Sequence, residues 1–122
     1  MNKKQETVNR NIEAILEGVH RKKGKHILKI DLTTIHHTEC SYFVICHGTS
    51  STQVDAIAHS VEETVEELTN ETVWHRDGYR NAIWILLDYG EIMVHIFQKE
   101  ARDFYNLEGL WADAKITEIE EN

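Results

Sequence analysis

Hydrophobic and polar residues form their clearest pattern between residues 82 and 97. Two apolar runs of strand length, 82–88 and 91–97, flank a short polar break that contains Gly90. Both runs are rich in β-branched and aromatic residues, and Gly90 is free to adopt the positive φ that a tight turn often needs. The pattern predicts a β-hairpin around which the rest of the chain is organised.

Both faces of this predicted hairpin are apolar, since side chains alternate between the two faces of a strand. One face carries Ile83, Ile85, Leu87, Ile92, Val94 and Ile96; the other carries Ala82, Trp84, Leu86, Asp88, Glu91, Met93, His95 and Phe97. A sheet with one face in water shows a polar face there, so the second face is covered by the chain's own helices or by a partner. Its mixture of large apolar groups with a carboxylate and an imidazole suits a binding surface, but the pattern leaves both interpretations open.

Helical periodicity appears twice before the hairpin. The apolar stripe of the first helix is Val8, Ile12, Ile15, Leu16 and Val19. Gly24 follows this stripe and is placed to terminate the helix. A second helix is predicted after Ser50, which together with Gln53 has the form of a capping box.

Three further strands are predicted, at 26–32, 42–46 and 72–76. The run 42–46 is continuously apolar, as expected for a central strand buried on both faces. The run 72–76 is short and is expected nearer an edge of the sheet. A short helix is predicted to start at 98, directly after the hairpin.

The order of elements is therefore α-β-β-α-β-β-β-α, which predicts an α/β fold. We expect one domain over residues 1–122, with a mixed β-sheet of about five strands and two to three helices. Residues 113–122 are expected to form a flexible acidic tail. So few helices for a sheet of this size favour an apolar patch that the chain itself leaves open.

Composition narrows the class of protein. The chain is 41% hydrophobic, enough for a single core, and it contains no apolar run long enough to span a membrane. The first residues lack the apolar segment of a secretory signal, and two cysteines, Cys40 and Cys46, do not make a disulfide framework. We expect a cytoplasmic protein with no membrane partner.

The formal charge of −8 bears on the partner. Affinity for nucleic acid comes largely from Lys and Arg side chains that neutralise phosphates, so direct binding to nucleic acid is not expected. An acidic protein that works near RNA would instead bind a basic protein surface. Solubility alone also explains an acidic surplus.

The turn Gly48-Thr49-Ser50 lies between a buried strand and a helix, where backbone N–H groups can bind a phosphate. It resembles the glycine-serine turn of nucleotidyltransferases, whose chemistry also needs two strand carboxylates to hold a metal ion. No Asp-x-Asp or Asp-x-Glu strand follows, and Glu62 and Glu63 fall on the predicted helix. A nucleotide-binding or nucleotidyltransferase-type enzyme stays as the alternative to a simple helix cap.

The sequence gives weaker support for a metal site, a cysteine nucleophile or a catalytic histidine. His36, His37, Cys40, Cys46 and His47 cluster in the sequence, but they lack a Cys-x-x-Cys pair and are expected not to form a metal site. Nothing in the sequence supplies a base that would activate either cysteine as a nucleophile. Asp88 and His95 form either a catalytic pair across the hairpin, a satisfied polar pair or two recognition residues.

Several blocks of sequence, in order along most of the chain, match one known family. They are Tyr42-Phe43-Val44-Ile45-Cys46 with Gly48-Thr49-Ser50-Ser51, then Gln53-Val54 and Ile57-Ala58, Trp84-Ile85-Leu86-Leu87-Asp88-Tyr89-Gly90-Glu91, Val94-His95-Ile96-Phe97, and Arg102 with Tyr105-Asn106-Leu107-Glu108 and Leu110-Trp111. On these residues the chain resembles the ribosomal silencing factors, also called Iojap-type or ribosome-associated factors.

The resemblance implies a nucleotidyltransferase-like fold without transferase activity, and so no catalytic residues, metal or cofactor. It implies a translational repressor that binds the large ribosomal subunit through large-subunit ribosomal protein fourteen and sterically blocks joining of the small subunit, especially under nutrient limitation. It also implies a link to assembly of the large subunit, and it allows a homodimer.

Carried over residue by residue, the resemblance places the contact surface on the hairpin and the helix after it. The expected contacts are Trp84, Leu86, Asp88, Tyr89, His95, Phe97, Tyr105 and Leu107, with Met93 completing the patch. Trp84 is the expected aromatic anchor, because tryptophan is enriched at binding hot spots. Asp88 is expected to orient His95 or to pair with a basic group of the partner.

Overall fold

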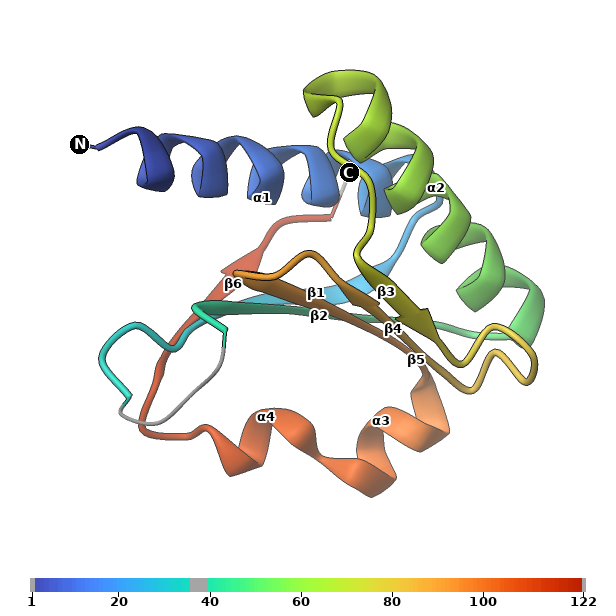
Figure 1. Cartoon of the computed structure of the whole chain (residues 1–122). Coiled ribbons are helices and arrows are strands. Elements are labelled where there is room, and N and C mark those ends of the chain that lie inside the picture. Colours follow the sequence, from blue (N-terminus) through green and yellow to red (C-terminus); the bar gives the residue numbers. More distant parts are fainter. Residues whose placement is uncertain (1, 36–39, 122) are drawn as a thin grey trace.

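The computed structural model describes residues 2–35 and 40–121 as one mixed β-sheet with helices on both faces (Figure 1). The strands are β1 (Lys25–Asp31), β2 (Tyr42–Gly48), β3 (His75–Asp77), β4 (Trp84–Asp88), β5 (Ile92–Gln98) and β6 (Lys115–Ile119). The helices are α1 (Lys3–Arg21), α2 (Ser51–Thr69), α3 (Lys99–Tyr105) and α4 (Leu107–Leu110). The α/β class and the predicted order of the first eight elements are confirmed.

The strands lie in the order β3-β4-β5-β2-β1-β6. The pair β2–β5 is parallel and the other neighbours are antiparallel. The predicted central strand lies in the interior of the sheet, and Phe43 to Gly48 are buried. The predicted edge strand is an edge strand, although it forms at His75–Asp77 rather than at 72–76.

The end of the chain differs from the sequence prediction. Lys115–Ile119 form β6, which pairs antiparallel with β1 from Asp31 opposite Lys115 to Ile27 opposite Ile119. The expected flexible tail at 113–122 is therefore wrong for these residues, and the sheet has six strands instead of about five. Backbone hydrogen bonds to the free edge of β1 hold this segment, and they need no particular side chains.

Helix α1 ends just before Gly24, as its sequence predicts, and Asn2 caps its start. Asn2 Oδ1 accepts a hydrogen bond from the Gln5 backbone N–H at 2.8 Å, which caps the first turn. At the other end, the Gly24 N–H bonds to the Val19 carbonyl at 3.0 Å, while Lys23 takes the left-handed conformation with φ 59°. The chain then turns directly into β1.

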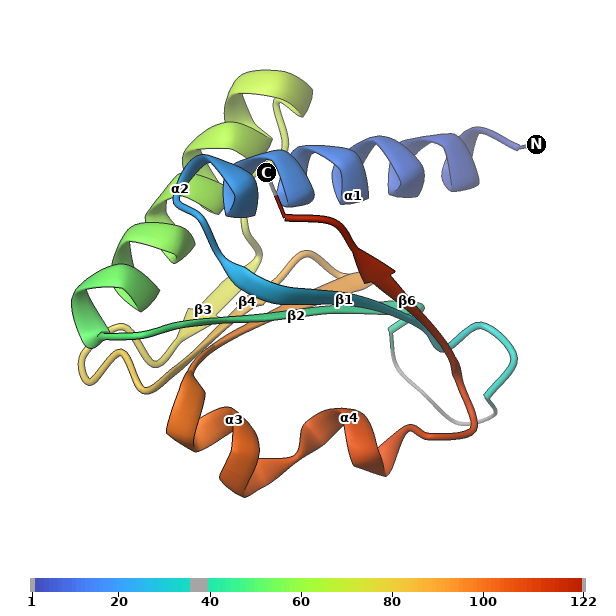
Figure 2. The ribbon, with the colours of Figure 1, turned by 180° about the vertical axis from the view of Figure 1, so that it is seen from behind.

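Helices α1 and α2 cross closely at Gly18. A Cβ atom on this glycine would lie 2.7 Å from the Cα of Val61, so any larger residue would force the helices apart. The Ser60 hydroxyl donates to the Gly18 carbonyl at 2.7 Å across the same contact. The two helices therefore form one rigid layer on one face of the sheet (Figure 2).

The predicted cap of α2 is present and also reaches α1. Ser50 Oγ accepts from the Gln53 N–H at 3.1 Å, and the Gln53 side chain accepts from the Thr49 N–H at 2.8 Å. The same side-chain amide donates to the Lys22 carbonyl at 3.3 Å. The start of α2 is thus fixed to the end of α1.

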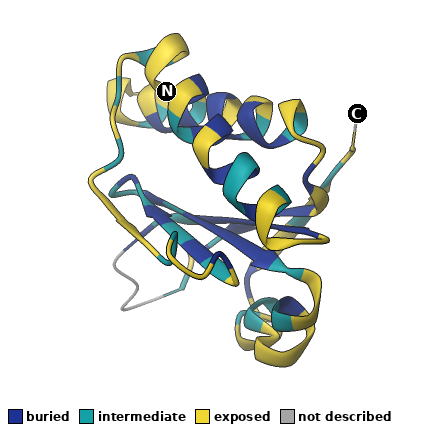
Figure 3. Ribbon diagram, turned by 90° about the vertical axis from the view of Figure 1, so that its right-hand side faces the viewer, coloured by how far each residue is buried: buried dark blue, intermediate teal, exposed yellow. Residues whose placement is uncertain are grey.

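Two apolar cores lie on opposite faces of the sheet. The larger packs the sheet against α1 and α2 and includes Ile15, Ile57, Ile85 and Val94. The smaller lies on the face covered by α3 and α4 and is centred on Phe97, with Ala101, Leu107 and Trp111 packed against it. Figure 3 shows that the sheet between the layers is mostly buried, while the outer sides of the helices are exposed.

Candidate functional site

The predicted hairpin is formed by β4 and β5, which pair with Trp84 opposite Phe97 and Asp88 opposite Met93. Gly90 lies in the turn with φ 84°, the conformation expected for it. The face that carries Trp84 looks toward α3 and α4, and the face that carries Ile85 looks toward α1 and α2. We call the half-exposed residues of the first face and the adjoining helices, Trp84, Leu86, Met93, Tyr105 and Leu107, the hairpin surface.

Trp84 is held on three sides and remains partly accessible to solvent. Its indole stacks on Phe97, with ring centroids 4.8 Å apart, and lies 5.0 Å from the Tyr105 ring of α3. Its burial is intermediate, and Tyr105 is 50% exposed. The chain's own helices α3 and α4 therefore cover part of the second hairpin face, and Trp84 and Tyr105 stay partly exposed beside the covered part.

His95 positions the indole. The Trp84 Nε1–H donates to His95 Nδ1 at 3.1 Å, and the imidazole packs edge-on against Phe43 with centroids 4.6 Å apart. Burial lowers the pKa of His95 from its ordinary value to about 4, so the ring is neutral near pH 7. A neutral ring that accepts at Nδ1 carries its proton on Nε2.

Asp88 and His95 have different partners, which removes the basis for a catalytic pair. Asp88 Oδ1 accepts from the Gly90 N–H at 2.7 Å and closes the hairpin turn. The expectation that Asp88 orients His95 is wrong, because the polar contact of His95 is the Trp84 indole. Asp88 stays partly exposed beside Met93, where a basic group can reach its carboxylate.

Three of the expected contacts are buried: His95, which is 5% exposed, and the rings of Phe97 and Tyr89. Phe97 is fully buried and supports the Trp84 indole from beneath. Tyr89 is buried in the core on the α1 and α2 side of the sheet, opposite to the hairpin surface. Neither ring is accessible on the hairpin surface, whereas Trp84, Leu86, Tyr105 and Leu107 lie together there.

Phe104 extends the hairpin surface and is absent from the sequence prediction. It is 81% exposed, and its ring meets Tyr105 edge-on with centroids 5.1 Å apart. Leu110 is 75% exposed on α4. Exposed apolar side chains that lie together in this way are a common feature of interaction surfaces, and the signal in the sequence is the Phe104-Tyr105 pair itself.

Arg102 fixes these helices to the sheet. It is 3% exposed, and its guanidinium donates to the His26 carbonyl at 2.6 Å and to His47 Nδ1 at 3.0 Å. It also forms an ion pair with Glu108 of α4 at 3.2 Å. Burial and the nearby guanidinium lower the pKa of His47, so this imidazole is a neutral acceptor. One buried cation thus ties β1, β2, α3 and α4 together.

The turn Gly48-Thr49-Ser50 is arranged as a helix cap. The N–H groups of Thr49 and Gln53, which would face a phosphate, bond to Gln53 Oε1 and Ser50 Oγ. Glu62 lies far along α2, where it pairs with Arg76 at 2.8 Å. The Glu62 carboxylate is therefore engaged with β3 and is not available to this turn.

The predicted cysteine and histidine cluster can be followed only for Cys40, Cys46 and His47. His36 and His37 lie outside the described residues, and no group of three or more His, Cys, Asp or Glu side chains suited to a metal ion occurs within residues 2–35 and 40–121. Burial raises the pKa of the Cys46 thiol to about 12, which keeps it protonated and unreactive. None of the helices in the described part of the chain combines the length and apolar character of a membrane span.

These features define an α/β domain with a mixed six-stranded sheet and an aromatic surface left partly open beside two short helices. Residues 5–122 match the family described as ribosomal silencing factor during starvation. The chain belongs to the ribosomal silencing factor family. As a member it is a ribosome-associated regulator of translation.

Individual relatives support the same family assignment. The chain is 37% identical over 109 residues to a ribosomal silencing factor of Halalkalibacterium halodurans, covering 89% of this chain and 92% of that protein. It is 38% identical over 99 residues to that of Bacillus subtilis, covering 81% and 82%. A crystal structure from Bacillus halodurans matches with a TM-score of 0.74 and 33% identity, covering 88% of this chain and 96% of that one.

Proposed function

We propose that this protein represses translation by binding the large ribosomal subunit through large-subunit ribosomal protein fourteen, so that the small subunit cannot join. The hairpin surface is the contact, with Trp84 as its anchor. Occupation of the face where the small subunit docks excludes the small subunit by steric overlap, and nutrient limitation is the condition under which this repression is used.

The observation that carries the proposal is the half-exposed Trp84 between Phe97, His95 and Tyr105. An indole already fixed by stacking and by a hydrogen bond loses little conformational freedom on binding, which favours its use as a hot spot. Phe104 and Leu110 widen the apolar area beside it. The net charge of −8 complements a basic ribosomal protein and speeds the encounter.

The geometry narrows the proposed contacts. Trp84, Leu86, Tyr105 and Leu107 touch the partner directly, and Asp88 pairs with a basic group. His95 and Phe97 contribute by holding the indole in place, and Tyr89 by supporting the turn from the other side. This division follows from burial, because a side chain without accessible surface cannot bury more on binding.

The experiment is a titration of the purified ribosomal protein with wild type and with Trp84→Ala. Truncation of a hot spot costs about 2 kcal/mol, which is roughly a 30-fold loss of affinity. Because Trp84 is half-buried, Trp84→Phe serves as a second variant that keeps the stacking and removes the N–H donor. Unchanged affinity in a folded Trp84→Ala variant removes Trp84 from the interface.

The same surface also offers a contact between two copies of this chain. A homodimer closed over Trp84 would mask the surface until the ribosome displaces the second copy. Sedimentation of wild type and Trp84→Ala separates the two uses: loss of a dimer in the variant places Trp84 in a self-interface, and a monomer in both assigns the surface to the ribosome alone.

The alternative function is a nucleotide-dependent enzyme that uses the Gly48 turn. The internal hydrogen bonds of Thr49 and Gln53 favour the helix cap. Titration with nucleotide and Mg²⁺ distinguishes the alternatives, because only an enzyme of that kind requires saturable binding of both.

A further inference from the structure

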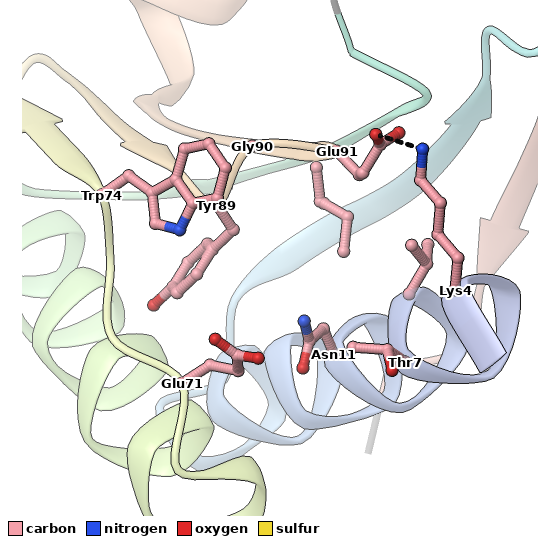
Figure 4. A pocket seen from close by; sticks show the side chains of 10 residues that line it. Lys4, Thr7, Asn11, Glu71, Trp74, Tyr89, Gly90 and Glu91 are labelled. Atoms are coloured by element: carbon pink, nitrogen blue, oxygen red, sulfur yellow. Dashed lines mark ion pairs between the residues drawn. The ribbon is translucent and has the colours of Figure 1, made fainter.

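A cavity of about 390 Å³ lies on the side of the hairpin away from the hairpin surface (Figure 4). The first half of α1, the hairpin turn and the segment that follows α2 enclose it. Val8 and Ile92 are buried in its lining. Its size falls within the range of small-molecule and side-chain binding pockets.

Two polar side chains in this lining are more than nine-tenths buried and carry atoms without partners. Asn11 is 9% exposed and Tyr89 is 7% exposed. Within the described residues, neither Asn11 Oδ1 nor the Tyr89 hydroxyl oxygen has a hydrogen-bond partner. Figure 4 shows the Asn11 carboxamide reaching up from α1 and the Tyr89 ring reaching down from the hairpin turn. Buried polar atoms in native proteins are almost always bonded, so these two indicate a polar occupant.

Trp74 supplies an aromatic wall. Its indole is 74% exposed and lies directly against the hairpin turn, where a Cβ on Gly90 would be 2.8 Å from the ring. The Trp74 backbone N–H bonds to the Asp88 carbonyl at 2.8 Å, which fixes the residue at the sheet edge. A large indole is thereby held at the mouth of the cavity with much of its surface in water.

The electrostatic character of the cavity is negative. Figure 4 shows the Glu71 carboxylate turned toward the space beneath Tyr89. Lys4, the cation at the rim, pairs with Glu91 at 3.2 Å, so the two charges offset each other. Burial, and to a lesser extent the carboxylates of α2, raise the pKa of the Tyr89 hydroxyl, so this group stays protonated near neutral pH. The cavity therefore combines hydrogen-bond acceptors, aromatic rings and two carboxylates, of which that of Glu91 is paired with Lys4.

We propose that this cavity binds a guanidinium group, either from an arginine side chain of a protein or from a free guanidino compound. A guanidinium carries only donors, is planar and stacks on aromatic rings, so it complements Asn11, Tyr89, Glu71 and the Trp74 indole together. Its aliphatic stem packs along Val8 and Ile92. The site lies on the opposite face of the sheet from the hairpin surface and is independent of it.

The test uses the full chain labelled with ¹⁵N, with the indole N–H signals of Trp74, Trp84 and Trp111 as three internal reporters. The probes are agmatine, a free guanidino compound, and N-acetyl-arginine amide, which represents an arginine within a peptide. N-acetyl-citrulline amide has nearly the same shape without the charge. We expect a saturable shift of the Trp74 signal with a guanidino probe, and no saturable shift of the Trp84 or Trp111 signals.

Glu71→Gln removes the charge at a partly exposed position and should weaken binding roughly tenfold. Glu63→Gln, on the exposed side of α2, is the matched control and should leave binding unchanged. Binding of agmatine alone assigns the site to a free compound, and binding of the capped arginine assigns it to a protein side chain. No saturable shift with either probe, equal binding of the citrulline compound, or full binding by Glu71→Gln overturns the proposal.

Discussion

The Trp84 indole N–H donates to His95 Nδ1 at 3.1 Å, across the face of the hairpin. The hydrogen bond joins the most accessible aromatic group of the hairpin to a buried neutral base. It fixes the direction of the indole, while Phe97 stacks on the indole ring and the tilted Tyr105 ring packs against it. The surface that we assign to the ribosome is therefore organised before any partner arrives.

The buried His95 predicts a loss of stability in acid. Its pKa is about 4 in the folded chain against an ordinary value near 6.5, so between these values the unfolded chain binds a proton that the folded chain does not. The resulting stability is complete above pH 6.5 and is lost as the pH falls toward 4, at about 1.4 kcal/mol per pH unit. Urea unfolding at pH 6.5, 5.5 and 4.5 measures the slope. His95→Gln keeps a hydrogen-bond acceptor but cannot titrate, so the pH dependence of its free energy of unfolding should be smaller by the contribution of one proton. An equal pH dependence in wild type and variant would assign the effect to other groups.

Arg102→Ala should destabilise the fold by about 3 kcal/mol, because it leaves Glu108 and buried acceptors on β1 and β2 without their donor. Arg102→Lys should recover only part of this loss, since a single ammonium cannot serve partners in three directions. Urea denaturation at pH 7 measures both variants. A cost below about 1 kcal/mol for Arg102→Ala would show that α3 and α4 are held by apolar packing alone.

Gly90→Ala should cost about 1 to 2 kcal/mol, because the residue has φ 84° and a Cβ there would lie 2.8 Å from the Trp74 ring. The strain has two sources, and a double-mutant cycle separates them. In a Trp74→Ala background the ring contact is gone, so Gly90→Ala should cost less, with the backbone term remaining. Equal costs in the two backgrounds would mean that Trp74 does not lie over the turn in solution.

Phe104→Ser should leave stability within about 0.5 kcal/mol, because the ring is 81% exposed, and it should still weaken binding to the large subunit. Leu68→Ser is the matched control, since Leu68 is 50% exposed on α2 on the other face of the sheet. Melting temperatures and binding to purified large subunits are measured for both. If both variants bind the large subunit equally well, Phe104 lies outside the contact, which would then be limited to the hairpin.

The alternation of side chains along a strand correctly predicted which residues of β4 lie on each face of the sheet. Ile85 and Leu87 lie in the core against α1 and α2, and Trp84 and Leu86 lie on the other face, as a period of two requires. When the same alternation is continued one residue past the end of β4, Tyr89 falls on the same face of the sheet as Leu87. Its assignment to the contact surface came from the family resemblance, and the local pattern was the better guide.

Strand β6 and the burial of Phe97 could not be predicted from the sequence, because both depend on contacts between distant parts of the chain. Ile116 and Ile119 in β6 are three residues apart, which is not a strand period, so the pattern gave no sign of a strand that backbone pairing with β1 creates. The burial of Phe97 depends on α3 folding back beneath the sheet and on the Arg102 contacts that hold it there. The hydrophobic periodicity of a short stretch of sequence predicts neither the direction of α3 nor the burial of Arg102.

We infer that this protein keeps the ribosomal subunits apart by means of the hairpin surface. The direct measurement is a sucrose gradient of purified large and small subunits, mixed with and without the protein under conditions in which they join. We expect wild type to shift material from the joined ribosome to separate subunits and to travel with the large subunit. Folded Trp84→Ala should do so only at much higher concentration. An unchanged fraction of joined ribosomes with saturating wild-type protein would contradict the inference.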